Sequence, residues 1–272
     1  MSKIRVGVVG CAGRMGQALI RQILVTEGCV LSGGTERTGA DSIGKPILNP
    51  VTFEPTGLVV GDDAGALISA SDVVIDFTAP MATLHHAHLA AAAGVAHIVG
   101  TTGLGPDHQK ALDVAAEQTV IVQSANMSLG VNLLMGLSRQ VAALLDEDFD
   151  IEVLEMHHRH KVDAPSGTAL ALGEAVAEGR GVDLAAVSDR VRDGLTGPRT
   201  RGHIGFATLR GGNVVGDHTV IFAADDERIE LTHKAGDRSI FARGAVKAAL
   251  WAYGKKPGRY SMADVLGFAA NG

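Results

Sequence analysis

The sequence predicts an α/β protein with two domains: a Rossmann-type domain built on a parallel sheet, and a second α+β domain built on a mixed or antiparallel sheet. Short apolar runs alternate with helical patterns in the first half, and this βαβα order is typical of a parallel sheet. Three apolar runs with few helices follow later, which indicates a mixed or antiparallel sheet. We expect the first domain to span residues 1–127, completed by 240–272, and the second to span 128–239.

The composition limits the classes of function. The 272 residues suffice for one large or two ordinary domains. Hydrophobic residues make up 46% and charged residues 20%, as in soluble globular proteins, and the net charge of −6 predicts no binding to nucleic acid. The uncharged stretch 118–138 is interrupted by polar residues and glycines, so we interpret it as a strand, a loop and a buried helix and expect no membrane span.

We expect a cytoplasmic location. A strand is predicted from Lys3 onward, which leaves no room for a signal peptide. The sequence has two cysteines, Cys11 and Cys29, and Cys11 lies in a glycine-rich turn. A structural disulfide is therefore not expected.

A glycine-rich turn follows the first predicted strand, residues 4–9. Gly10, Gly13 and Gly16 have the spacing G-x-x-G-x-x-G, and a helical pattern follows them. A strand, a glycine turn and a helix are the context of a dinucleotide-binding fingerprint, because glycine lets the backbone approach a pyrophosphate at the helix N-terminus. The spacing differs from the stricter G-x-G-x-x-G, so a plain strand-to-helix turn remains an alternative.

The second predicted strand, residues 29–33, leads to Glu36 and Arg37. An acidic residue about 20 positions after the turn is expected to accept hydrogen bonds from the adenosine ribose. Arg37 could instead bind a 2′-phosphate through a bidentate contact. The pair predicts NADH or NADPH without deciding between them, and an ordinary surface dipeptide is the alternative.

The rest of the first half continues the pattern. Residues 41–61 contain three prolines and are expected to form a loop. Ligands of parallel sheets lie off the carboxyl ends of strands, so the small polar loops 100–103 and 124–128 are expected to line the nicotinamide half of a site. We predict strands at 73–77, 97–99 and 120–122, and helices at 82–93 and from Pro106. Five histidines are interpreted as ordinary surface or packing residues: His85, His86, His88, His97 and His108.

The second half begins with a predicted helix at 130–145. Phe149, Ile151 and Val153 alternate with polar residues and predict a strand. Further strands are predicted at 204–209, 214–222 and 228–233, after a polar stretch at 183–202. A helix at 239–253 and the tail are assigned to the first domain. Because an open sheet face needs covering, we expect a homo-oligomer.

The most informative stretch runs from Glu155 to Thr168, where five of fourteen residues can carry positive charge. Ser166 or Thr168 is expected to cap a following helix, whose N-terminus attracts a carboxylate or phosphate. Histidine and lysine side chains there could bind an anion and also supply a proton. A solvated basic loop is one alternative. A metal site is another, although the spacing of its histidines is a poor match to the usual helix-borne pairs.

These residues resemble a known family. Gly10–Gly16, Gly100–Gly103 and above all Glu155–Thr168 are similar to the motifs of the 4-hydroxy-tetrahydrodipicolinate reductases, also called dihydrodipicolinate reductases. The resemblance extends over nearly the whole chain. It implies a two-domain homotetramer that reduces a cyclic imine dicarboxylate with NADH or NADPH in the diaminopimelate route to lysine.

The resemblance also implies roles for individual residues. His157 and Lys161 would be the catalytic acid-base residues, while His158, Gly167 and Thr168 would bind the carboxylates of the substrate. No metal is implied. The cofactor-binding residues would be Gly10, Cys11, Ala12, Gly13, Arg14, Met15, Glu36, Arg37, Gly100, Thr101, Thr102, Ser124, Ala125, Asn126 and Met127.

Three other functions compete with this one. A different NAD(P)-dependent dehydrogenase of amino-acid metabolism shares the first domain. A nucleotide-sensing regulator would bind NAD(H) without turnover, but it leaves the acid-base loop unexplained. A metal-dependent hydrolase would use His157, His158 and His160 as ligands.

Overall fold

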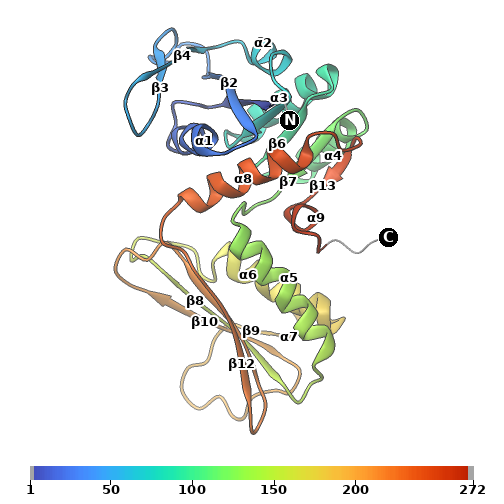
Figure 1. Ribbon diagram of the computed structural model, residues 1–272. Helices are drawn as coiled ribbons and strands as arrows, with labels where there is room; N and C mark the ends of the chain where they lie inside the picture. Colours follow the sequence, from blue (N-terminus) through green and yellow to red (C-terminus); the bar gives the residue numbers. More distant parts are fainter. Residues whose placement is uncertain (1–2, 269–272) are drawn as a thin grey trace. The chain divides into compact units, whose positions relative to one another are not determined.

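The computed structural model describes residues 3–268 and divides the chain into two compact units (Figure 1). The first comprises the chain up to Leu129 and from Ser239 onward, and the second spans Gly130–Arg238. The roles predicted for the two domains stay predictions. Over the described range, no helix is long and apolar enough to cross a membrane.

The described part of the first unit forms an eight-stranded sheet in the order β13-β7-β6-β5-β1-β2-β4-β3. Its pairings within the described residues are parallel except that of β3 with β4. β1 lies between β2 and β5, so the chain adds strands first on the β2 side of β1 and later on its β5 side. Such a switch point is where α/β sheets bind ligands. The strands are β1 (Ile4–Val9), β2 (Cys29–Thr35), β3 (Pro46–Leu48), β4 (Pro55–Gly61), β5 (Val73–Asp76), β6 (Ala96–Val99), β7 (Val120–Gln123) and β13 (Gly258–Tyr260).

Helices cover both faces of this sheet. Leu19, Ile20 and Ile23 form the apolar stripe of α1 and pack with buried residues of α8 in one core cluster. On the other face α2, α3 and α4 pack side by side. The helices are α1 (Arg14–Val25), α2 (Ala64–Ser69), α3 (Pro80–Ala93), α4 (Pro106–Ala116), α8 (Ser239–Ala252) and α9 (Met262–Leu266).

The prediction of a loop at residues 41–61 was wrong, because this segment contains β3 and β4. β4 pairs in parallel with β2, where Gly34 is opposite Val60, and β3 closes the edge of the sheet. Pro46 and Pro55 each open a strand. Proline lacks an N–H to donate and is tolerated at an edge or at the first residue of a strand. The prolines therefore hid the edge strand β3 and its neighbour β4 in the sequence.

The second unit has a five-stranded sheet in its described residues, in the order β12-β11-β8-β10-β9. The central strand β8 pairs in parallel with β10 and antiparallel with β11, so the predicted mixed sheet is confirmed. The strands are β8 (Asp150–His157), β9 (Ser188–Asp189), β10 (Ile204–Arg210), β11 (Asp217–Ala223) and β12 (Arg228–Lys234), and the helices are α5 (Leu129–Leu144), α6 (Gly167–Arg180) and α7 (Leu184–Val187).

Burial alternates along β8. Ile151, Val153, Glu155 and His157 are buried, and the residues between them are partly exposed. Because successive side chains of a strand point to opposite faces, Glu155 and His157 lie on the same face as the apolar core residues. The core on this face includes Leu172 and Phe222.

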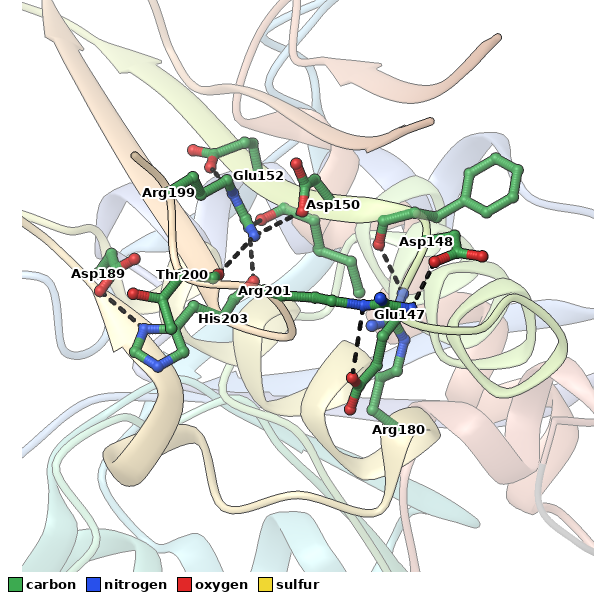
Figure 2. Close-up of polar contacts among 12 residues, drawn as sticks. Glu147, Asp148, Asp150, Glu152, Arg180, Asp189, Arg199, Thr200, Arg201 and His203 are labelled. Carbon is green, nitrogen blue, oxygen red and sulfur yellow. Dashed lines mark hydrogen bonds and ion pairs between the residues drawn. The ribbon is translucent and has the colours of Figure 1, made fainter. Parts of the chain in front are cut away.

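At the other end of β8, ion pairs tie the segment between β9 and β10 to the sheet (Figure 2). Arg199 donates to Asp150 at 2.8 Å, to Glu152 at 3.1 Å and to the carbonyl oxygen of Ile151 at 2.8 Å. Arg192 adds a bidentate pair to Glu152. This network secures the polar stretch at the end of the sheet opposite His157.

We expect Arg199→Ala to destabilise the second unit by about 2–3 kcal/mol, because it leaves two carboxylates and a carbonyl oxygen without their shared donor. Its side chain is 19% exposed. Arg201→Ala is the matched control, since that side chain is 67% exposed and its ion pairs contribute at most about 1 kcal/mol. Urea unfolding of both variants measures the difference, and equal effects would contradict this ranking.

Candidate functional site

The glycine turn between β1 and α1 depends on glycine at specific positions. Gly10 has a φ of +70°, a left-handed conformation that glycine adopts readily. A Cβ atom on Gly16 would lie 2.3 Å from the carbonyl oxygen of Gly10. The first turn of α1 is therefore pressed directly against the glycine turn.

The N-terminus of α1 has unpaired donors. Its cap residue, Gly13, makes no side-chain capping bond. The amides of Arg14, Met15 and Gly16 have no hydrogen-bond acceptor among the residues that the structure describes. Free amides and the positive end of a twelve-residue helix together favour a phosphate group at this position.

A cavity of about 790 Å³ adjoins this turn. It lies off the carboxyl ends of several parallel strands, and Gly10, Glu36, Arg37, Thr78 and His86 are among the residues that line it. Its volume suits a small-molecule ligand. Together with the free amides of α1, these residues fit the adenosine diphosphate half of a nicotinamide dinucleotide.

Glu36 also stabilises the turn itself. Its carboxylate accepts a hydrogen bond from the amide of Ala12 at 2.9 Å. Arg37 is exposed and lines a second cavity of about 450 Å³ together with Ala12, Gly13 and Ser42. Glu36, predicted to contact the adenosine ribose, and Arg37, predicted to bind a 2′-phosphate, thus both border open space beside the glycine turn.

Cys11 and Met15 turn away from this space. The Cys11 side chain is fully buried against Gly34, and burial raises the pKa of its thiol to about 11. Met15 packs against the apolar core. These two residues can therefore face a cofactor through their backbone. Ala12, Gly13 and Arg14 are exposed.

The other predicted cofactor residues follow β6 and β7, at the carboxyl ends of parallel strands. Thr102 and Ala125 are exposed, whereas Met127 is buried. The loop after β7 is ordered by its own hydrogen bonds, since the Ser124 hydroxyl donates to the carbonyl oxygen of Asn126 at 2.7 Å. A Cβ atom on Gly100 would meet the ring of Phe77 at 2.3 Å, so glycine is required for this packing.

The hydroxyl of Thr101 points inward to a buried carboxylate, Asp76, at 3.3 Å. His86 and His97 bond to the same carboxylate, at 2.8 and 3.3 Å. Both histidines are buried, within the predicted surface or packing roles, and they share one buried carboxylate as a partner. Their separate positions on a helix and a strand gave no sign of a common partner.

In the second unit, His157 ends β8 and its Nδ1 pairs with the carboxylate of Glu155. The same carboxylate accepts two bonds from Arg210, both at 2.9 Å, and one from the amide of Ser166 at 3.0 Å. Burial opposes ionisation of Glu155, but the bonds from Arg210, His157 and Ser166 outweigh it and lower its pKa. An ionised carboxylate accepts only, so Nδ1 of His157 carries a proton and Nε2 is the nitrogen left for proton exchange.

His218 packs edge-on against His157, with ring centres 5.0 Å apart. Its Nε2 lies 3.2 Å from the hydroxyl of Ser166. Burial, and then the neighbouring His157, lower the pKa of His218 to about 4. His218 is therefore neutral at neutral pH and places no second cation beside His157. Gly216 leaves room at Nε2 of His157, because a Cβ atom on residue 216 would lie 3.0 Å from this nitrogen.

The remaining predicted residues lie in the loop after His157 and at the start of α6. Lys161 donates to both carboxylate oxygens of Asp163, at 2.8 and 2.9 Å. The amide of His158 donates to Val214 at 2.8 Å. Ser166, one of the two expected caps, accepts from the amide of Ala169 at 3.1 Å. Gly167 and Thr168 form the first two positions of α6. These residues thus lie close together in the chain, in the loop after β8 and in the first turn of α6.

The structure adds two residues to which the sequence analysis gave no role. Arg210 is opposite His157 in the pairing of β10 with β8, and His218 is opposite Glu155 in the pairing of β11 with β8. The alternation along β8 could have shown that Glu155 shares a face with His157. Within residues 3–268, no group of three or more histidine, cysteine, aspartate or glutamate side chains is arranged to hold a metal ion.

Comparisons with known proteins identify the family of this chain. The family model of the dihydrodipicolinate reductase N-terminus matches residues 4–127, and that of the C-terminus matches residues 130–266. A 4-hydroxy-tetrahydrodipicolinate reductase of Ruegeria sp. (strain TM1040) is 58% identical over 260 residues, covering 96% of this chain and 97% of the relative. That of Brucella abortus (strain 2308) is 57% identical over 261 residues, with coverages of 96% and 97%.

A solved structure shows the same fold. The dipicolinate-bound dihydrodipicolinate reductase of Paenisporosarcina sp. TG-14 matches with a TM-score of 0.77 at 23% identity, covering 96% of this chain and 98% of that chain. This confirms the predicted fold class. With both family models matched and relatives more than half identical over nearly its whole length, the chain belongs to the dihydrodipicolinate reductase family of oxidoreductases.

Proposed function

We propose that this protein reduces 4-hydroxy-tetrahydrodipicolinate to tetrahydrodipicolinate with NADH or NADPH, in the diaminopimelate route to lysine; a hydride and a proton are added and the 4-hydroxyl group leaves as water. The observation that carries the proposal is the anchoring of His157 by the ionised, buried Glu155 at the start of a cationic loop. The family membership supplies the substrate class. The homotetramer and the individual site roles remain predictions from the family resemblance.

The second unit supplies the groups for a dicarboxylate substrate. Lys161 lies in the loop that runs from His157, at the end of β8, to the positive N-terminus of α6. Cations and helix N-termini both attract carboxylates. In this proposal Gly167, Thr168 and His158 also contact the carboxylates. Nζ of Lys161 would then bond to a substrate carboxylate in addition to Asp163, because it already donates to both carboxylate oxygens of Asp163.

The proton that completes the reduction comes from His157 or Lys161. The bound nicotinamide supplies the hydride. Glu155 holds the His157 ring in one orientation through Nδ1, which leaves Nε2 as the nitrogen that exchanges a proton with the nitrogen of the substrate ring. The neutral His218 beside it restricts the ring without competing for charge.

The first unit supplies the cofactor site. In this proposal the free amides of Arg14, Met15 and Gly16 bind the diphosphate, and Glu36 accepts hydrogen bonds from the adenosine ribose. Arg37 borders the second cavity and would bind the 2′-phosphate of NADPH. Acceptance of either cofactor follows from this pair.

An assay of purified protein tests the proposal. We expect NADPH to be oxidised with the cyclic imine dicarboxylate and not with aspartate semialdehyde. Pyridine-2,6-dicarboxylate should inhibit, since it carries both carboxylates on a planar ring, and a chelator should have no effect. A nucleotide-sensing regulator would oxidise no NADPH with any of these substrates. Turnover with aspartate semialdehyde alone would favour a different dehydrogenase.

A further inference from the structure

Asp76 is a fully buried charge in the first unit whose role the proposed mechanism does not use. It ends β5, beside the switch point of the sheet. Among the described residues its carboxylate accepts bonds from the amide of Thr78 at 2.9 Å, the hydroxyl of Thr78 at 2.6 Å and the hydroxyl of Thr101 at 3.3 Å. His86 and His97 add the two ring bonds described above. The cluster therefore joins α3, β6 and the loops that follow β5 and β6.

Burial of a charge is costly unless the charge is well compensated. Here burial opposes ionisation of Asp76, but the bonds from His86 and His97 outweigh it and hold its pKa well below the usual range. The carboxylate is thus ionised at neutral pH and acts only as an acceptor. Nδ1 of His86, 2.8 Å from it, must carry a proton.

The other nitrogen of His86 is free for a ligand. The His86 side chain is 11% exposed and lines the 790 Å³ cavity together with Gly10, Glu36 and Thr78. Within the described part of the chain its Nε2 has no hydrogen-bond partner, and it is not among the buried unpartnered atoms. With Nδ1 fixed, Nε2 is an acceptor when the ring is neutral and a donor when it is protonated.

We propose that His86 binds the adenosine diphosphate half of the dinucleotide through Nε2, and that Asp76 is the positioning residue that orients its ring. Asp76 also holds Thr78, a neighbouring wall residue of the cavity, by two bonds. The inference rests on the dinucleotide binding of the proposed function. It differs from a packing role, which predicts effects on stability without a selective effect on nucleotide affinity.

Calorimetric titration of the full chain with ADP and with NADPH tests the proposal. His86→Asn should lower the affinity for both ligands by about tenfold, as expected for the loss of one hydrogen bond to a charged or fixed partner. Equal losses of affinity for ADP and NADPH would place the contact on the adenosine diphosphate half, which is the part that the two ligands have in common. His88→Asn is the matched control, because His88 lies on the same helix but lines a separate groove between α3 and α4. It should leave both affinities unchanged.

The coupling between the two residues is the more selective measurement. Asp76→Asn should weaken the binding of ADP by at least a similar factor. Adding His86→Asn to Asp76→Asn should then cause no further loss, since the contact of His86 is already removed. Additive losses would overturn the positioning role. Should Asp76→Asn fail to fold, the His86→Asn titration still decides, and unchanged affinity there sinks the proposal. Failure of the unsubstituted chain to bind NADPH or ADP would instead contradict the proposed function as well.

Discussion

Lys161→Met is expected to lower kcat by about 10²–10⁴-fold, the usual contribution of a positioned proton donor, with little change in cofactor affinity. Lys161 belongs to the second unit, and the residues proposed to bind the dinucleotide belong to the first. Its side chain is 20% exposed, so methionine can replace its apolar stem without leaving a cavity. Steady-state kinetics with the cyclic substrate, together with titration by NADPH, separates the two effects.

Arg159→Met is the control for Lys161→Met. Arg159 is an exposed cation of the same loop, so its loss changes the local charge by the same amount. We expect it to raise KM modestly and to leave kcat unchanged. If both variants lost the same fraction of kcat, the role of Lys161 would be general attraction of the substrate rather than proton transfer. A Lys161→Met enzyme with full turnover would remove this residue from the mechanism.

Glu155→Gln is expected to affect both turnover and stability. Glutamine has no charge to pair with Arg210, and its NH2 group cannot accept the bonds that Arg210, His157 and Ser166 donate. The Glu155 side chain is 1% exposed, and breaking a buried ion pair from one side typically costs about 3–5 kcal/mol. We expect kcat to fall by about 10²-fold or more, because His157 loses its fixed proton position. Urea unfolding and steady-state kinetics measure the two losses.

The pH dependence of stability identifies the charge of Glu155 as the cause. Its pKa in the folded protein is lowered from an ordinary value of 4.5. The stability it contributes is therefore complete above pH 4.5 and is lost as the pH falls through the lowered pKa. Unfolding free energies should decline less steeply below this pH in Glu155→Gln than in the unsubstituted chain. Parallel curves would refute the assignment.

Glu152→Gln provides the comparison on the same strand. Glu152 lies on the opposite face of β8, at the far end from His157, and pairs with Arg192. It also pairs with Arg199, and both of these residues are labelled in Figure 2. We expect the free energy of unfolding to fall by about 1 kcal/mol, because these ion pairs are partly open to solvent, and kcat to stay unchanged. A fall in kcat equal to that of Glu155→Gln would show that any charge lost from β8 disturbs the site.

Local patterns predicted much of this protein correctly. The glycine turn, the βαβα alternation and the later run of strands gave the fold class, which the shared fold confirms. The Pro-Ser-Gly-Thr sequence placed a helix cap, and Ser166 is that cap. The resemblance of the Glu155–Thr168 stretch identified the family, which the family models confirm. These features depend on residues close together in the sequence, where periodicity and capping chemistry act.

The sequence by itself therefore determined the two-sheet architecture, the family and the loop that carries His157 and Lys161. The tertiary structure alone decided which residues support that loop. Arg210 and His218 reach Glu155 and His157 through the strand register of β10 and β11 against β8, and Asp76 brings together His86 and His97 from a helix and a strand. Such contacts join residues that are distant in the chain. They arise from pairing and packing across the whole domain, which no local pattern encodes.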